Sequence, residues 1–185
     1  MDANMINPFL QATLEIIRDT AHLHYQLQKI YRKKDDKGRG DITGIIGLSG
    51  SGKGTVAVTF DQRTILYITS KILDMEPENI DEATVMDTAG ELANMITGRA
   101  VRILSEKGFD LNLTVPTVVH GPDHKVIHQA GGPKIAIPYS SDQGNFTVEF
   151  SFDEDMKPDM PQPAAETPNE SGNKTPSNWG VSEAG

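Results

Sequence analysis

Apolar residues recur at helical spacing in three parts of the chain. The first predicted helix begins at Asn7-Pro8, a capping residue followed by a proline that suits the first turn of a helix. We expect Asp61 to cap a second helix and Asp81 to cap a third, long helix that ends near Gly108. The second helix is expected to direct four apolar residues inward, namely Ile65, Ile68, Ile72 and Leu73.

Seven other segments are predicted to be strands, because their β-branched and apolar residues cluster or alternate between turn residues. They are residues 26–33, 42–48, 55–60, 111–119, 125–128, 134–139 and 145–152. Helices and strands come in groups along the chain and do not alternate one by one. The pattern therefore predicts an α+β fold with helices packed on one face of a largely antiparallel sheet.

The C-terminal segment differs in composition from the rest of the chain. From residue 156 onward, five prolines stand among acidic and small polar residues, with almost nothing apolar to bury. Such a segment cannot recover the entropy that ordering would cost. We therefore expect one domain over residues 1–155 and a disordered, acidic, proline-rich tail over residues 156–185.

The charge balance excludes several classes of partner. The chain carries a formal net charge of −9, of which −5 belongs to residues 153–185. Nucleic acids and anionic membranes need a basic surface, so neither is an expected partner. The chain contains no cysteine, which excludes disulfides, thiolate zinc sites and cysteine nucleophiles. With no long apolar run and no signal-peptide pattern, we expect a cytoplasmic protein.

The third predicted helix carries two stripes. Its apolar side comprises Val85, Ala89, Leu92, Ile96, Ala100 and Ile103, and its opposite side comprises Asp87, Glu91, Asn94 and Gly98. Polar helix faces are commonly just solvated, but asparagine is a mediocre helix former, and interior glycines such as Gly90 and Gly98 each cost about 1 kcal/mol relative to alanine. These residues indicate that something approaches the helix closely around Glu91 and Asn94. Their carboxylate and carboxamide could accept a cation and hold a water.

This motif resembles the signature of a known family. Asp87-x3-Glu91-x2-Asn94, followed 22 positions later by Pro116, resembles the signature of the CheC/CheX/FliY family of chemotaxis phosphatases. The segments 7–9, 40–50 and 116–119 also look like the CheX branch, so the resemblance covers most of residues 5–150. One copy of the motif is visible, as in CheX.

The resemblance implies a phosphatase that removes the phosphoryl group from the aspartate of a phosphorylated CheY-type response regulator. Asn94 would orient the attacking water, and Glu91 would pair with the regulator's lysine. Asp87 and Pro116 would be supporting positions. The chain would need no cofactor of its own, since Mg²⁺ would be supplied by the regulator. The CheX branch also implies a homodimer.

Two other functions stay open. One is a non-catalytic adaptor or switch component that binds the regulator without hydrolysis. The other is nucleotide binding, because residues 47–53 fit the phosphate-binding pattern GxxxxGK. That loop needs a helix immediately after its lysine, whereas residues 55–60 alternate like a strand, so we expect a hairpin turn.

Two further groups of residues carry weaker signals. His120, His124 and His128 are spaced four apart, but Gly-Pro-Asp at 121–123 breaks any helix that would align them as metal ligands. The charged residues at 32–36 are expected to be solvated at a strand end and turn.

Overall fold

The computed structural model describes residues 3–122 and 124–158. In chain order its elements are α1 (Ala3–Ala21), β1 (Gln26–Leu27), β2 (Tyr31–Lys33), β3 (Ile42–Gly50), β4 (Gly54–Phe60), α2 (Gln62–Leu73), the 3-10 helix η1 (Pro77–Asn79), α3 (Glu82–Ser105), β5 (Leu111–Leu113), β6 (Thr117–His120), β7 (Lys134–Ser141) and β8 (Gly144–Phe152). Within these residues, none of the helices has the length and apolar character needed to cross a membrane.

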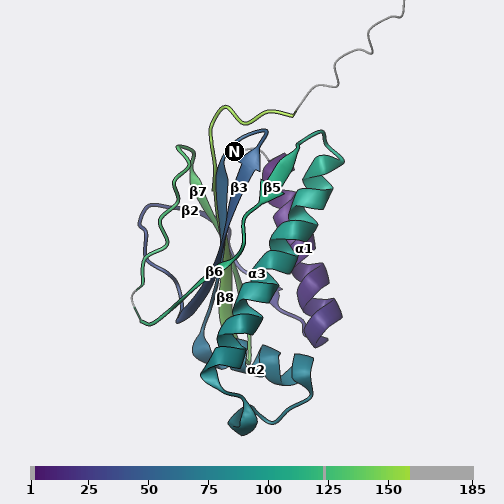
Figure 1. Cartoon of the computed structure of the whole chain (residues 1–185), viewed down its shortest axis with the longest axis vertical. Coiled ribbons are helices and arrows are strands. Elements are labelled where there is room, and N and C mark those ends of the chain that lie inside the picture. The colour runs from purple at the N-terminus through teal and green to yellow at the C-terminus, as the bar shows by residue number, and fades with distance from the viewer. Residues whose placement is uncertain (1–2, 123, 159–185) are drawn as a thin grey trace, which may run out of the picture.

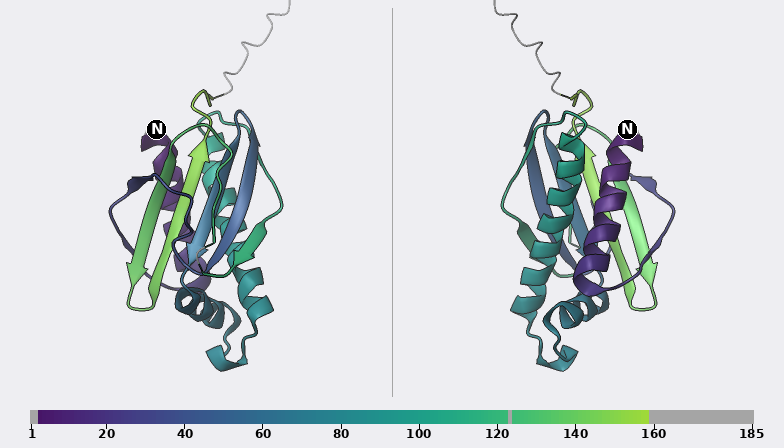
Figure 2. Two further views of the ribbon diagram at one scale, coloured as in Figure 1. Left: turned by 90° about the vertical axis from the view of Figure 1, so that its left-hand side faces the viewer. Right: turned by 90° about the vertical axis from the view of Figure 1, so that its right-hand side faces the viewer.

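The strands form one antiparallel sheet. Its order is β1-β7-β8-β4-β3-β5, with β2 also paired to β7 and β6 also paired to β3. Helices α1, α2 and α3 lie together on one face of this sheet (Figure 1, Figure 2). The predicted α+β fold, with helices on one face of an antiparallel sheet, is confirmed.

The main core lies between the helices and the sheet. Phe9 of α1 stacks on Phe150 of β8 with ring centroids 4.4 Å apart. Helix α3 packs directly on the backbone of β3 at Gly44, where a Cβ atom would lie only 2.6 Å from the Cβ of Ala93. The predicted apolar stripe of α3 is buried, except that Ile103 is only half-buried.

The face of the sheet opposite the helices is covered by segments without regular secondary structure. The imidazole of His124 lies 2.5 Å from the hydroxyl of Thr43 on β3, and Ser151 of β8 donates a hydrogen bond to the Gly132 carbonyl. The strand predicted at residues 125–128 is wrong, because this segment makes only an isolated bridge, between Lys125 and Lys37. Of its two apolar residues, Val126 is buried against the sheet, whereas Ile127 is exposed.

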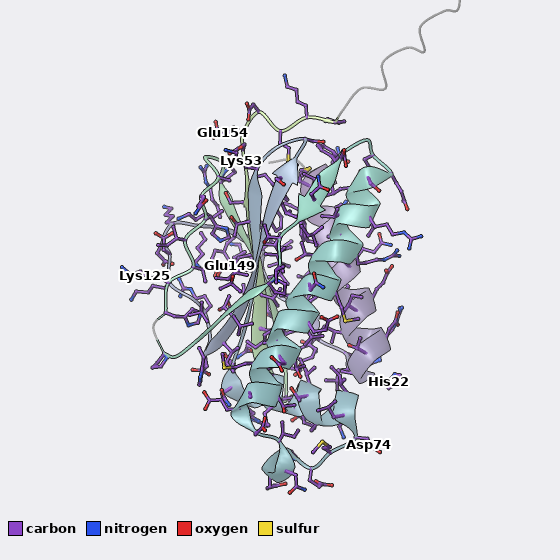
Figure 3. The ribbon with its side chains drawn as sticks, viewed as in Figure 1. His22, Lys53, Asp74, Lys125, Glu149 and Glu154 are labelled. Atoms are coloured by element: carbon purple, nitrogen blue, oxygen red, sulfur yellow. The ribbon has the colours of Figure 1, made fainter. Side chains whose placement is uncertain are left out.

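A buried ion pair lies beneath this cover. The ammonium of Lys33 on β2 is 2.6 Å from both carboxylate oxygens of Glu149 on β8, and each side chain is 1% exposed. His128 also contacts this carboxylate, with its Nε2 atom 3.6 Å from Oε2. Figure 3 shows Glu149 in the middle of the sheet. The expectation that Lys33 is solvated is therefore wrong: pairing with Glu149 compensates for its burial.

The first helix begins earlier than predicted. Helix α1 starts at Ala3, so Pro8 lies inside it and not in its first turn. Proline has no N–H to donate to the carbonyl four residues before it, here that of Asn4. The ammonium of Lys107 donates to the Asn4 carbonyl at 3.1 Å and so supplies a hydrogen bond at the position that Pro8 leaves open.

The other helix starts are at the predicted positions. Asp81 caps α3 by accepting a hydrogen bond from the Thr84 backbone N–H at 2.8 Å. Hydrogen bonds from Thr84 hold the pKa of the Asp81 carboxyl below its ordinary value. Asp61 occupies the N-cap position of α2 but forms no capping bond. Its carboxylate accepts instead from the Asn145 N–H, and Asp41 accepts from the first helical N–H of α2.

The predicted single strand at 26–33 is two short strands, β1 and β2, that both pair with β7. Most of the predicted tail, residues 159–185, lies outside the described residues. Met156 lies within the described residues and packs against the hydrophobic core. The predicted boundary at residue 155 places it in the tail.

The buried ion pair generates a stability prediction. Lys33→Met leaves the Glu149 carboxylate buried without its cation and should lower the free energy of unfolding by about 3–5 kcal/mol. Removing both charges in Lys33→Met/Glu149→Leu should restore most of that loss. The measurement is urea unfolding, with the exposed neighbour Lys34→Met as the control, for which we expect a change within about 0.5 kcal/mol. A loss below about 1 kcal/mol in Lys33→Met would contradict this account.

Candidate functional site

Asp87, Glu91 and Asn94 of the motif lie with Gly98 along one line on the surface of α3, here called the α3 ridge. Asp87 and Glu91 are exposed, whereas Asn94 and Gly98 are half-buried. Within residues 3–122 and 124–158, nothing forms a side-chain hydrogen bond or ion pair with Glu91 or Asn94. Both polar groups can therefore bind a partner without first breaking an internal contact.

The ridge is held on a rigid support. Helix α3 is 24 residues long and packs on β3 through its buried side. On its flank, the Arg99 guanidinium lies 2.6 Å from a carboxylate oxygen of Glu15 on α1. This contact with Arg99 holds the pKa of the Glu15 carboxyl below its ordinary value. The ion pair joins α3 to α1 five residues after Asn94.

Pro116 lies against α3 at a bulge in the edge strand. Ile45 pairs with Thr117 and Leu48 with Leu113, so two residues of β3 face three residues of the edge. Bulges occur at sheet edges and next to functional sites, and a proline fits there because it has no N–H to donate. The predicted strand 111–119 is therefore divided into β5 and β6. The structure places Pro116 beside the ridge.

Gly90 serves internal packing. A Cβ at this position would lie 3.0 Å from a methyl carbon of Val118 and 3.9 Å from the Cβ of Pro116. The space beside Gly90 is therefore occupied by the edge strand of this same protein. The expectation that Gly90 opens the helix to a partner is wrong, since β6 is what approaches it.

A groove borders the ridge on its other flank. It has a volume of about 320 Å³ and lies among the C-terminal ends of α1 and α2 and the first half of α3. Asp87 and Glu91 form part of its wall, together with Ile72 and Leu73 of α2. These two apolar residues are 37% and 43% exposed, so the expectation that they point inward is wrong. Helical periodicity alone could not show that no core element covers the last turn of α2.

The glycine-rich loop lies in a β-hairpin. It joins β3 to β4, and Gly50 has a positive φ of 119°. Its N–H groups have internal acceptors: Ser51 donates to the Asp110 carbonyl, and Lys53 donates to the carboxylate of Asp153. A strand follows the loop where a phosphate-binding loop needs a helix. Figure 3 shows Lys53 beside Glu154 at one end of the molecule. The nucleotide-binding alternative has no support in this geometry.

The three evenly spaced histidines are in separate surroundings. His120 pairs with Glu82 at 2.5 Å, His124 contacts Thr43, and His128 faces Glu149. In the described part of the chain, no cluster of three or more histidine, cysteine, aspartate or glutamate residues could hold a metal ion.

The chemistry available at the ridge is that of a carboxylate and a carboxamide three residues apart. Side chains at this spacing are neighbours on a helix surface, with Cβ atoms about 5–6 Å apart. Glu91 can accept hydrogen bonds from a cationic group, and Asn94 can both donate and accept. The pair can therefore dock a positively charged group and hold a polar molecule beside it.

Comparisons with known proteins identify what the chain is similar to. The family described as chemotaxis phosphatase CheX matches residues 42–140. The CheY-P phosphatase CheX of Thermotoga maritima is 29% identical over 127 residues, which cover 68% of this chain and 81% of that protein. The crystal structure of a CheC-like superfamily protein from Shewanella sp. PV-4 is 40% identical, covers 83% of this chain and 99% of its own, and has a TM-score of 0.76.

A third relative was crystallised with a partner. The structure of a CheX–CheY–BeF3–Mg²⁺ complex from Borrelia burgdorferi matches with a TM-score of 0.68 and 27% identity. The match covers 80% of this chain and 97% of that one.

The hairpin geometry predicts that Lys53 has no role in phosphate binding. Lys53→Ala should change the free energy of unfolding by no more than about 0.5 kcal/mol, because its hydrogen bonds are made by its backbone N–H and carbonyl, which the substitution keeps. ATP should shift the thermal midpoint of neither the parent protein nor this variant. A midpoint that rises with ATP in the parent and not in Lys53→Ala would restore the nucleotide-binding function.

Proposed function

Because the chain belongs to the chemotaxis phosphatase CheX family, we propose that it hydrolyses the aspartyl phosphate of a phosphorylated CheY-type response regulator. One observation carries the proposal: Glu91 and Asn94 are side by side on the α3 ridge, without internal partners among the described residues. The relative from Thermotoga maritima is named a CheY-P phosphatase, and the relative from Borrelia burgdorferi was crystallised with CheY.

The reaction needs little from the phosphatase beyond placement of a water. The water oxygen attacks phosphorus in line with the bond to the regulator's aspartate, that P–O bond breaks, and the products are a free carboxylate and inorganic phosphate. Positioning a reactant in this way can supply a large part of a rate acceleration. In our proposal the Asn94 carboxamide enters the regulator's active site and orients this water. It has a donor and an acceptor for that purpose.

Glu91 would fix the geometry of docking. In our proposal its carboxylate pairs with the lysine of the regulator's active site, a charge-assisted contact that is stronger than a neutral hydrogen bond. The exposure of Glu91 supports this role, because its charge is free to meet a cation.

Asp87 and Pro116 would act as supporting positions. Asp87 is exposed one turn before Glu91 and would lie near the edge of the contact with the regulator. Pro116 packs beside Gly90 at the edge-strand bulge, where it would keep the flank of the ridge in place.

The remaining parts of the proposal concern the metal and the assembly. We propose that the regulator binds the Mg²⁺ of the reaction and that this chain needs no cofactor of its own. The Borrelia burgdorferi complex, which contains CheY and Mg²⁺, supports that division of roles. A homodimer remains a prediction from the family resemblance, and a cytoplasmic location remains a prediction from the sequence pattern. Light scattering of the purified chain would test the dimer.

The proposal is tested by the decay of the phosphorylated regulator. Asn94→Ala should lose about 100-fold or more of the stimulated decay rate, because the water is no longer oriented. Its affinity for the regulator should change little. The matched control is Asn79→Ala, which alters an exposed asparagine in η1. An Asn94→Ala protein with near-parental activity would overturn the water-positioning role. A parent that binds the regulator without accelerating decay would be an adaptor instead.

Substitution of Glu91 should change the kinetics in a different way from substitution of Asn94. Glu91→Gln removes the charge and should weaken docking by about 1.5–3 kcal/mol. We expect a raised half-saturation concentration, together with slower turnover. Glu154→Gln removes an exposed charge elsewhere and serves as the control. Unchanged affinity in Glu91→Gln would exclude the contact with the lysine.

A further inference from the structure

Gly98 differs from Gly44 and Gly90, the two close-packed glycines near the site. Internal packing is tight at Gly44 and Gly90, because a Cβ at either position would lie 3.0 Å or less from a neighbouring atom. At Gly98 the nearest heavy atom would be a methyl carbon of Leu113 at 4.0 Å, which is ordinary van der Waals contact. Internal packing therefore leaves room for a Cβ atom at position 98.

Backbone conformation does not require glycine at this position either. Gly98 lies in the interior of α3 and is not among the glycines with positive φ, which are Gly50, Gly108, Gly121 and Gly144. Glycine destabilises a helix interior relative to alanine. The chain therefore carries a residue at this position that weakens its own helix without easing any contact among the described residues.

The position of Gly98 suggests why it lacks a side chain. It lies on the α3 ridge one helical turn after Asn94, about 6 Å further along the helix axis. A partner that surrounds the Asn94 carboxamide must also contact the helix surface next to it. A Cβ atom or a longer side chain at position 98 would then lie between the helix backbone and the partner. Displacements of about 1 Å can cost on the order of 100-fold in rate.

We propose that the regulator packs directly on the bare α3 backbone at Gly98, which makes this glycine a positioning residue for Asn94. This inference rests on the proposed function and adds a contact residue outside the Glu91–Asn94 pair. The surface of the regulator would occupy the space that the missing side chain at Gly98 leaves open.

The test separates fold stability from docking. Gly98→Ala should raise the thermal midpoint by about 2–4 °C through better helix propensity. The same variant should lower kcat/KM for the phosphorylated regulator by about threefold, and Gly98→Leu by about tenfold or more. Both the half-saturation constant and the turnover number should worsen, because the regulator is held away from Asn94. Stability and activity should thus move in opposite directions in Gly98→Ala.

The matched control is Ala83→Leu, which enlarges an exposed small residue in the first turn of the same helix. Affinity is measured by calorimetry with regulator activated by beryllofluoride and Mg²⁺, using the full chain. Weaker binding by Gly98→Leu, with parental binding by Ala83→Leu, supports the contact. Parental binding and kinetics in Gly98→Leu would overturn it.

This contact and the proposed function can fail separately. If the parent accelerates decay and Asn94→Ala does not, but Gly98→Leu matches the parent, the contact is wrong and the phosphatase function stands. If the parent fails to accelerate decay, the phosphatase function is wrong, and the calorimetric comparison still decides the contact. Absence of any binding by the parent would overturn both.

Discussion

The site depends on the close contact between α3 and the backbone of β3 at Gly44. A Cβ at Gly44 would lie 2.6 Å from the Ala93 Cβ and 2.8 Å from the Ala89 carbonyl oxygen, so only glycine lets the helix lie at this depth. Burial of one side of α3 against the sheet leaves its opposite side as the exposed ridge. The bulge that carries Pro116 then brings β6 against Gly90, and the Arg99–Glu15 ion pair fixes the other flank. The helix can thus be rigid although Glu91 and Asn94, the two side chains of the proposed site, have no side-chain partner among the described residues.

This arrangement suits a catalyst whose substrate supplies most of the chemistry. An enzyme that must abstract a proton needs a buried group with a tuned pKa. A protein that places a water beside a labile acyl phosphate needs a neutral amide on a firm support and a charge to orient the complex. Glu91 and Asn94 meet these needs while looking like ordinary surface residues. The strongly buried charges, Lys33 and Glu149, lie on the other face of the sheet, where they join β2 to β8.

The sequence predicted those features that depend on local pattern. The α+β class, the cap at Asp81, the buried stripe of α3 and the hairpin after β3 follow from periodicity and turn residues, and they are confirmed. The CheX family was found from the pattern Asp87-x3-Glu91-x2-Asn94 with Pro116, together with the segments 7–9, 40–50 and 116–119. It is confirmed by the family match. The predictions that were wrong concern features that depend on long-range contacts. Lys33 has the same local surroundings as its exposed neighbour Lys34, and only pairing with Glu149, 116 residues later, distinguishes the two. Likewise, no local signal showed that residues 125–128 cover the sheet without joining it.

The most direct test of the central claim is a crystal structure of this protein with its regulator activated by beryllofluoride and Mg²⁺. The quantity to measure is the distance from the Asn94 carboxamide to a water in line with the bond between beryllium and the regulator's aspartate. Our account predicts a hydrogen bond of about 3 Å to that water, with the α3 ridge buried in the interface. A complex in which Asn94 stays in solvent, while another surface of this protein binds the regulator, would contradict it.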